Sequence, residues 1–245
     1  MRGLPDGHSP ANSYANRVRG VCVAVMSATD RTTKSTDPDK LVRRLLEKAD
    51  TTYARQAGIS LRNTPQPLFQ LLMLCSLMSK PISADIAVAA ARELFGTGLR
   101  SPRAVLDAKR ADMIAAFGRA HYVRYDESTA TRLPDMARLA VDRYGGDLRR
   151  LAETGERDVE STKRLLKEFK GIGDTGADIF LREVQDVWTW ARPYLDKRAL
   201  GAARRLGLPA DPEKLGALAP RAQAKLAAAL IRVSLDDDLY DQMTK

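Results

Sequence analysis

The sequence predicts an all-α fold, and three observations lead to that prediction. Apolar residues recur at intervals of three and four along most of the chain, which is the period of an amphipathic helix. Glycine and proline divide these stretches into short segments, and no stretch of consequence alternates apolar and polar residues as a strand does. With 245 residues, 44% of them apolar, the chain is long enough to bury a substantial core.

Charge and cysteine content narrow the classes of protein further. The net charge of +9 is typical of proteins that bind a polyanion. Residues 1–36 contribute +3 of this charge, so +6 remains for residues 37–245. The two cysteines, Cys22 and Cys75, are too few for a disulfide framework or a zinc site. We therefore expect a protein of the reducing cytoplasm, associated with the nucleoid.

Residues 1–36 are rich in Gly, Pro, Ser, Asn and Thr, show little periodicity, and are expected to form a disordered extension. The apolar run at 20–26 is short for a signal peptide, and Met26 offers an alternative start of the chain. No segment approaches the ~20 apolar residues that a membrane-spanning helix needs. The sequence therefore predicts no membrane contact.

The first part of the folded region reads as three helices. Leu41, Leu45 and Leu46 define an apolar face from residue 38, and Tyr53 continues it. Residues 68–78 are apolar nearly all round, which predicts a buried central helix with Cys75 as a core thiol. Ser79-Lys80-Pro81 ends that helix, and residues 82–95 form the next one, which Gly96-Thr97-Gly98 ends.

The middle of the chain predicts several short helices. Ser101-Pro102 is typical of a helix start, and short helices follow over residues 103–116. His121, Tyr122 and Tyr125 then precede a helix through residues 133–144, in which Pro134 must start or kink a segment.

The last part predicts two paired helical patterns over residues 158–185 and three more helices after them. Trp188 and two further aromatic residues precede Asp196, which stands before a helix that Gly207 caps. A short helix starts at Pro212, and an Ala- and Leu-rich one runs from Pro220 to residue 235. The run of three aspartates at 236–238 has no other metal ligands beside it in the sequence, so we interpret it as solvated and predict no metal site.

The two paired patterns at 158–185 meet at Lys170-Gly171-Ile172-Gly173. Glycine tolerates positive φ, so Gly171 and Gly173 can turn the chain tightly and leave amide groups pointing outward. The helix that starts near residue 174 offers unpaired N–H groups and a positive dipole end, which favour phosphate. Ile172 is expected to project from the tip of the turn. On its own, this pattern is equally typical of a plain αα-hairpin.

The segment from Phe169 to Gly173, followed by Asp196 about twenty residues on, resembles the helix-hairpin-helix DNA glycosylases, the superfamily of endonuclease III and the adenine-mismatch and alkylbase glycosylases. In that family a Leu-x-Gly-hydrophobic-Gly hairpin holds the DNA backbone, and an aspartate stands just before a later helix. The resemblance is specific at these positions and loose elsewhere. It implies two helical lobes with duplex DNA between them, one at residues 64–187 and one that combines residues 38–63 with 188–245.

The resemblance also implies roles for individual residues. Asp196 takes the catalytic position, where a carboxylate stabilises the positive charge that develops on the sugar and helps to activate water. An ordinary helix N-cap is the alternative role for Asp196. The residues implied to contact DNA are Lys170, Gly171, Ile172, Gly173, Thr175, Lys80, Pro81, Lys197 and Arg198. The aromatic candidates for a pocket that holds an extruded base are His121, Tyr122, Tyr125 and Trp188, although packing in the core is their more common role.

Departures from the family pattern refine the expected reaction. Thr175 stands where strand-cutting members have a nucleophilic lysine, so the implied enzyme is monofunctional. The break at residues 80–82 lacks the glutamine that often enters the DNA stack. The chain also lacks the four C-terminal cysteines of an iron–sulfur cluster, so no cofactor is expected.

The function that the sequence favours is therefore base excision by a monomeric DNA glycosylase acting on double-stranded DNA. Two alternatives stay open: a helix-hairpin-helix protein that binds DNA without catalysis, and a helical interaction module that does not bind nucleic acid. Binding that weakens steeply with salt would separate the last of these from the other two.

Overall fold

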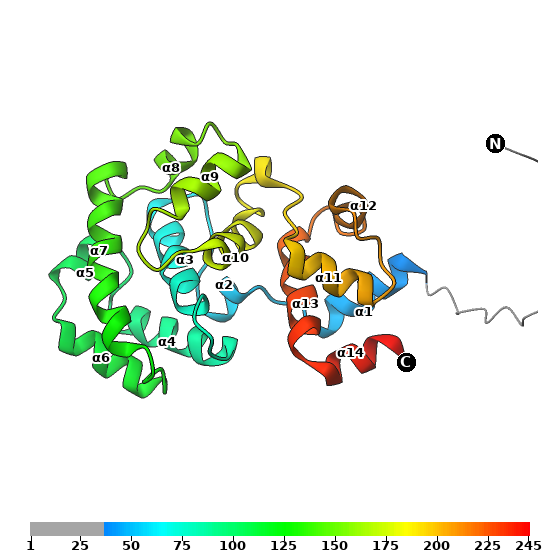
Figure 1. Cartoon of the computed structure of the whole chain (residues 1–245), viewed down its shortest axis with the longest axis horizontal. Coiled ribbons are helices and arrows are strands. Elements are labelled where there is room, and N and C mark those ends of the chain that lie inside the picture. The colour runs from blue at the N-terminus through cyan, green and yellow to red at the C-terminus, as the bar shows by residue number, and fades with distance from the viewer. Residues whose placement is uncertain (1–36) are drawn as a thin grey trace, which may run out of the picture. The chain divides into compact units, whose positions relative to one another are not determined.

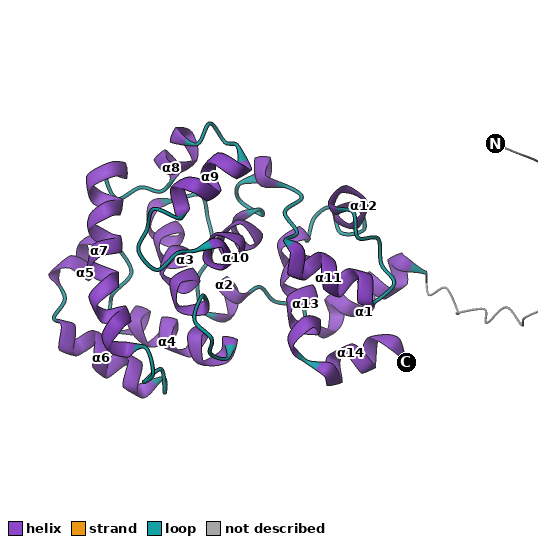
Figure 2. Cartoon of the chain, in the orientation of Figure 1, coloured by secondary structure: helices purple, strands orange, loops and turns teal. Residues whose placement is uncertain are grey.

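The computed structural model describes residues 37–245, so the expectations for residues 1–36, including Cys22 and the start at Met26, lie outside the described residues. Residues 37–245 contain helices, turns and loops but no strand, which confirms the predicted fold class for this range (Figure 2). Within the same range, no helix combines the length and the apolar character needed to span a bilayer.

The described helices follow one another with short connections. In chain order they are α1 (Pro38–Lys48), α2 (Tyr53–Gln56), α3 (Pro65–Met78), α4 (Ala84–Gly96), α5 (Pro102–Asp107), α6 (Arg110–Arg119), α7 (Asp126–Tyr144), α8 (Arg149–Thr154), α9 (Val159–Leu166), α10 (Asp174–Val184), the 3-10 helix η1 (Thr189–Ala191), α11 (Lys197–Arg205), α12 (Pro212–Ala217), α13 (Gln223–Leu235) and α14 (Asp237–Thr244).

Side-chain caps explain where many of these helices begin. The Ser101 hydroxyl accepts a hydrogen bond from the Ala104 amide, and Pro102 occupies the first helical position of α5. Aspartate carboxylates do the same before α9, α11 and α12, where Asp158, Asp196 and Asp211 each accept from an amide three residues on. Each cap satisfies a helix amide that would otherwise have no partner.

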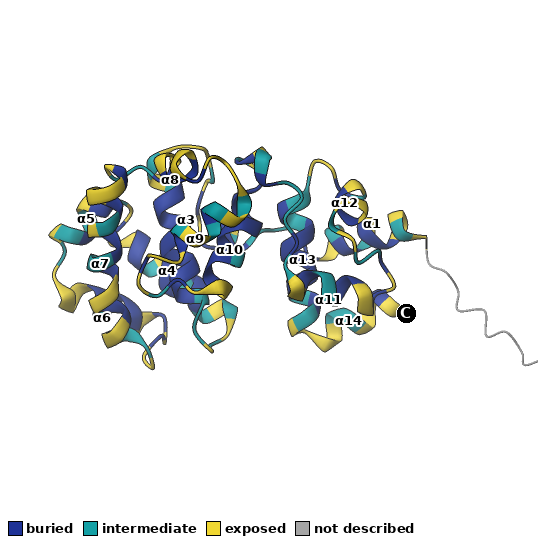
Figure 3. Cartoon of the chain, turned by 45° about the horizontal axis from the view of Figure 1, so that its top comes forward, coloured by how far each residue is buried: buried dark blue, intermediate teal, exposed yellow. Residues whose placement is uncertain are grey.

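The core is centred on α3, as its sequence predicts. Every residue from Leu68 to Leu77 is buried, and α3 is accordingly dark in Figure 3. Cys75 is fully buried, and burial raises the pKa of its thiol well above the ordinary value. A helix that buries its whole circumference must be covered on all sides, and α4 and α10 supply two of those covering surfaces.

Two sets of packing contacts extend from this core. In one set α7 packs against α5, α6 and α8, and α6 also packs against α4. In the other set α13 packs against α11, α1 and α14, so the first described helix lies beside the last two (Figure 1). Helix α10 contacts α3, α9 and α13, and therefore connects the core helix to the second set.

Three boundaries differ from those predicted. The helix expected to continue to Tyr53 is two helices, because Thr52 interrupts it and caps α2 through the Arg55 amide. Pro134 neither starts nor ends a helix but lies inside α7, where buried neighbours such as Leu133 and Ala137 hold the helix in place. The last long helix begins at Gln223 instead of Pro220.

Candidate functional site

The turn predicted at Lys170–Gly173 lies between α9 and α10. Helix α9 ends at Leu166, and α10 begins at Asp174 with Gly173 as its N-cap. Gly171 adopts φ 96°, a left-handed conformation that favours glycine. Gly173 instead has extended backbone, with φ −101° and ψ −163°, and a Cβ at this position would meet no atom within 4 Å. Conformation therefore requires glycine at 171, whereas at 173 glycine leaves open space over the start of α10.

The expectation that Ile172 projects from the turn is wrong. Its side chain is only 4% exposed, and its amide donates to the Phe169 carbonyl. A Cβ built on Gly176 would lie 3.3 Å from two carbon atoms of Ile172, so the isoleucine rests against the start of α10. Burying such a side chain is worth roughly 1.5–3 kcal/mol, which explains why it turns inward. Ile172 can contribute to a DNA interface only through its backbone.

Gly176 has a packing role that the sequence did not predict. Its missing side chain leaves room for the Ser79 hydroxyl, which would lie 2.5 Å from a Cβ on this residue. Ser79 follows α3 and donates to the Cys75 carbonyl at 2.6 Å. This close approach fixes the first turn of α10 against the end of the core helix.

Two lysines in and beside the hairpin are each paired with a carboxylate. Lys167 Nζ lies 2.7 Å from Asp174 Oδ1, and this pairing lowers the pKa of the Asp174 carboxyl. Lys170 Nζ lies 3.1 Å from Asp135 on α7, with the lysine side chain 73% exposed. No side chain caps the first turn of α10. Exposed pairs of this kind contribute little to stability, so the lysines remain available to a phosphate.

Asp196 stands at the start of α11 and has two structural partners. Its Oδ1 accepts a hydrogen bond of 2.9 Å from the Ala199 amide, as an N-cap does. Its Oδ2 forms an ion pair with Nη1 of Arg182, and only 8% of the aspartate side chain and 6% of the arginine side chain are exposed. The two neighbouring cationic residues do not pair with it: Arg198 donates to Ser234, and Lys197 is exposed.

Sequence reading did not identify Arg182 as a partner of Asp196. It is buried on α10 although arginine is normally exposed. The spacing of Thr175, Asp178 and Arg182, at intervals of three and four, was the available signal, because it places all three on one face of α10.

A cleft of about 1100 Å³ brings most of the predicted residues together. The α3–α4 connection supplies Lys80 and Pro81, and the face of α10 supplies Thr175, Asp178 and Arg182. The start of α11 supplies Asp196, Lys197 and Arg198, and further lining residues come from the range 231–239 of α13 and α14. Lys170 and the two hairpin glycines lie outside the lining of this cleft.

None of the aromatic base-pocket candidates lines the cleft. Tyr122 is fully buried and packs against Phe117, with ring centroids 5.2 Å apart. Tyr125 is half-buried against Tyr122, and His121 is exposed in a left-handed turn. Trp188 is 2% exposed and belongs to a different hollow. These residues were candidates because aromatic rings can stack on a base. The same apolar rings also pack well in a core, where Tyr122 and Trp188 are buried.

The cleft contains more carboxylates than we expect for a surface that binds DNA. The acidic run at 236–238 is exposed, as expected, and it lines the cleft together with Asp85. Asp236 also accepts from the Leu239 amide and so caps α14. The basic lining residues are Lys80, Arg182, Lys197, Arg198 and Arg232. With six carboxylates against these five cationic groups, the lining as a whole carries one net negative charge.

A network of contacts connects two lining residues of the cleft, Tyr53 and Arg232, to the buried Glu183. Glu183 is a buried residue of α10 and accepts hydrogen bonds from the Tyr53 and Ala54 amides at 3.2 and 2.7 Å. Burial raises the pKa of its carboxyl. Arg232 covers the Tyr53 ring at 4.4 Å and donates to the Thr51 carbonyl. This network joins the first turn of α2 to α10 and α13.

Asp178 is the centre of a second group of contacts. Its Oδ1 lies 2.5 Å from the Tyr194 hydroxyl and 2.5 Å from Lys163 Nζ. Burial, and then the bond to Asp178, raise the pKa of Tyr194. The pKa of Lys80, at the other side of the cleft, is lowered by burial and by the charge of Arg132.

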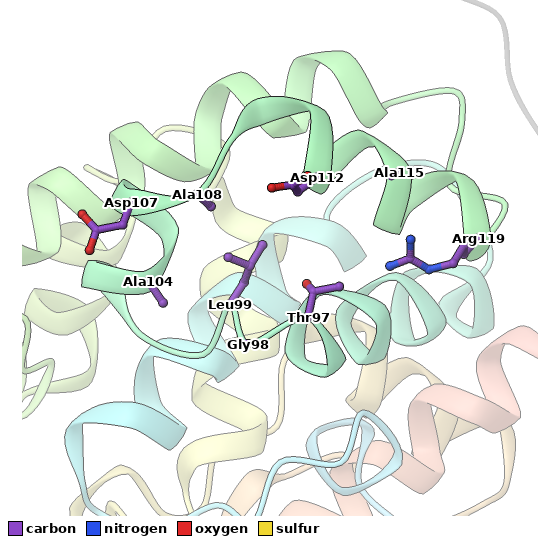
Figure 4. Close-up of a pocket in the computed structure, with 9 residues that line it drawn as sticks. All are labelled: Thr97, Gly98, Leu99, Ala104, Asp107, Ala108, Asp112, Ala115 and Arg119. Atoms are coloured by element: carbon purple, nitrogen blue, oxygen red, sulfur yellow. The ribbon is translucent and has the colours of Figure 1, made fainter.

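Figure 4 shows a smaller hollow of about 480 Å³ between the end of α4, α5 and α6. Asp107 and Arg119 lie at opposite ends of it, and each is paired with a neighbour, Arg103 and Glu93 respectively. None of the candidate site residues named from the sequence lines it. The cleft beside Asp196 is therefore the stronger candidate.

Comparison of the sequence with protein-family models and with curated proteins, and of the fold with solved structures, finds no match.

Proposed function

We propose that this protein is a monofunctional DNA glycosylase that hydrolyses the N-glycosidic bond of a damaged or mispaired base. One observation carries the proposal: the Asp196 residue lines a cleft that is also lined by Thr175, in the first turn of α10, and by Lys80, Lys197 and Arg198. A site for this reaction needs a fixed carboxylate beside the sugar and cationic groups near the flanking phosphates.

The surroundings of Asp196 suit a carboxylate that stabilises charge. Cleavage of the bond to the base develops positive charge on the sugar, and a fixed negative group beside it lowers the barrier. The Ala199 amide and Arg182 fix both carboxylate oxygens before substrate arrives. Preorganisation of this kind avoids the cost of reorienting the group during the reaction.

The hairpin supplies a separate contact to the DNA backbone in this proposal. The uncapped first turn of α10 presents amide groups beside Gly173, where no side chain intervenes. Lys170 is exposed next to it. Such a contact holds phosphate without reading sequence, so the hairpin positions the duplex while the cleft receives the base.

The test compares two Asp→Asn substitutions at helix N-caps. Asp196→Asn retains size and most hydrogen bonding but removes the negative charge, so base release should collapse while duplex binding persists. Asp211→Asn makes the same change at the cap of α12, outside the cleft, and should leave both unchanged. Base release is measured on duplexes that carry assorted lesions, followed by alkali cleavage of abasic sites.

Loss of the charge on Asp196 also leaves Arg182 buried without its partner, which costs about 3–5 kcal/mol. Melting curves for Asp196→Asn must therefore accompany the assay, and Asp196→Asn combined with Arg182→Gln serves as a second variant without the buried charge. Wild-type rates of base release in folded Asp196→Asn would refute the catalytic assignment.

A non-catalytic DNA-binding protein is the second candidate, and one observation favours it. Both oxygens of Asp196 are already engaged in structural contacts, so the aspartate has a full role without catalysis. Salt-dependent duplex binding by the wild-type protein, without base release on any lesion tested, is the outcome that selects this candidate.

A further inference from the structure

A third hollow, of about 590 Å³, lies where the start of α8 faces the segment that follows α10. Arg149, Arg150 and Arg157 contribute basic groups, and Trp188 and Trp190 contribute aromatic surface. None of these residues lines the cleft beside Asp196, so the hollow is a separate site.

The aromatic wall is a column of three rings that leads outward from the core. Phe180 and Trp188 have ring centroids 5.5 Å apart, and both are buried. Trp190 stacks on Trp188 at 5.4 Å, with 22° between the ring planes. Trp188 is fixed by its indole N–H, which donates to Asn63 at 3.0 Å. Trp190 is the outermost ring, is partly exposed, and borders the hollow.

The basic groups in the hollow differ in how far they are neutralised. The Arg149 side chain forms three hydrogen bonds with the Asp147 carboxylate, and these bonds hold the pKa of that carboxyl below its ordinary value. Arg150 and Arg157 form no ion pair with any residue in the range 37–245. The hollow also contains Glu153, so its lining retains one net positive charge.

The backbone of Arg157 has an unusual conformation. Glu156 and Arg157 both adopt left-handed conformations, with φ of 55° and 54°, although neither is glycine. The Arg157 amide donates to the Ala152 carbonyl at 2.8 Å and closes the turn after α8. Each such residue costs of order 1 kcal/mol, so strain at two consecutive positions marks a conformation that the surrounding structure enforces.

We propose that this hollow binds a nucleoside phosphate, with the base stacked on Trp190 and the phosphate held by Arg150 and Arg157. Every base has a π-face that stacks on an aromatic ring, and guanidinium groups match phosphate geometry. An aromatic ligand without charge would leave both arginines unused, and inorganic phosphate would leave the ring unused. The nucleoside phosphate is either a free nucleotide or one unit of a single strand.

The two tryptophans of the chain both line this hollow, so intrinsic tryptophan fluorescence reports on it alone. The full-length protein is titrated at low salt with AMP, adenosine, inorganic phosphate and a short oligothymidylate. AMP or the oligothymidylate should quench the emission saturably, whereas adenosine and phosphate should do so only at much higher concentration. Quenching by AMP identifies a free nucleotide as sufficient, and quenching by the oligothymidylate alone identifies a strand.

Single substitutions of surface residues test the assigned roles. Arg150→Gln and Arg157→Gln should each weaken binding about tenfold, the loss expected when a charge-assisted hydrogen bond is removed. Arg92→Gln changes the same charge on the exposed side of α4, away from the hollow, and should bind as wild type does. Trp190→Leu should abolish the rise in melting temperature that the bound ligand produces.

Three results would overturn the proposal. No quenching by either AMP or the oligothymidylate would remove the site. Equal affinity for adenosine and AMP would remove the phosphate contact. Equal weakening in Arg92→Gln and Arg157→Gln would assign the effect to net charge. None of these results depends on whether the protein releases bases from DNA.

Discussion

Glu183 is the buried residue whose protonation has the clearest consequence for stability. Burial raises the pKa of its carboxyl above the ordinary value of 4.5. Between pH 4.5 and the raised pKa, the folded protein therefore keeps a proton that the unfolded chain has released. Where the folded state binds more protons, the free energy of unfolding falls as pH rises. The window runs from about 4.5 up to the raised pKa in the folded state.

We expect Glu183→Gln to remove this contribution. Glutamine keeps an oxygen that can accept from the Tyr53 and Ala54 amides but cannot titrate. From pH 4.5 upward, the wild-type protein should lose stability relative to the variant. Urea unfolding at several pH values measures that difference, and Glu213→Gln on the exposed side of α12 is the control. A wild-type protein that instead gains on the variant with rising pH would show that the buried carboxylate is stabilised as an anion.

Gly171 and Gly173 look equivalent in the sequence but differ in backbone conformation. Gly171→Ala forces a side chain into the left-handed region and should cost about 1–2 kcal/mol. Gly173→Val meets open space at ordinary φ, so its melting temperature should match the wild type. The valine nevertheless stands beside the first amides of α10, and affinity for every duplex should fall alike. Anisotropy with labelled duplexes tests this, and unchanged affinity would remove the hairpin from the interface.

The contact between α10 and the end of α3 gives a prediction about coupling. Gly176→Ala places a methyl group 2.5 Å from the Ser79 hydroxyl and should destabilise the protein by about 1–3 kcal/mol. Ser79→Ala removes that oxygen, so the double variant should recover part of the loss. Chemical denaturation of all four proteins measures the coupling. Purely additive effects would show that the strain is relieved elsewhere, for example at Ile172.

Local patterns in the sequence predicted most elements, and long-range contacts account for most of what they missed. The apolar run of α3 and the turn at Gly171 are properties of consecutive residues, so they were predictable. The Arg182–Asp196 pair joins residues on different helices, and no local pattern specifies it. Ile172 and Tyr122 were misplaced because an apolar side chain suits an exposed contact or a core equally well in sequence.

For the molecule as a whole, the placement of lysines bears on the reaction type. Lys170 is at the hairpin and paired with Asp135, whereas Lys80 and Lys197 line the cleft. A covalent lyase needs an amine placed to within about an ångström of the sugar carbon, and Thr175 offers only a hydroxyl at the expected position. The protein should therefore leave an intact abasic site that breaks only after alkali or heat.

Borohydride added during turnover tests that expectation and should trap no protein–DNA adduct. Lys80 is the lysine to examine first, because its lowered pKa leaves more of the amine unprotonated. An adduct that disappears in Lys80→Ala, Lys170→Ala or Lys197→Ala would contradict this expectation and show that the protein is a lyase that uses a different amine.

The pairing of α1 with α13 and α14 determines when this fold can be completed during synthesis. The apolar face of α1, with Leu41, Val42 and Leu45, leaves the ribosome long before the helices that cover it. Because chains fold progressively as they emerge, α3 to α10 can assemble while α1 is still unprotected. Translation that stalls before residue 223 would leave that face exposed, and quality-control proteases and chaperones recognise such surfaces. The apolar face of α1 is therefore protected only after α13 and α14 have been synthesised.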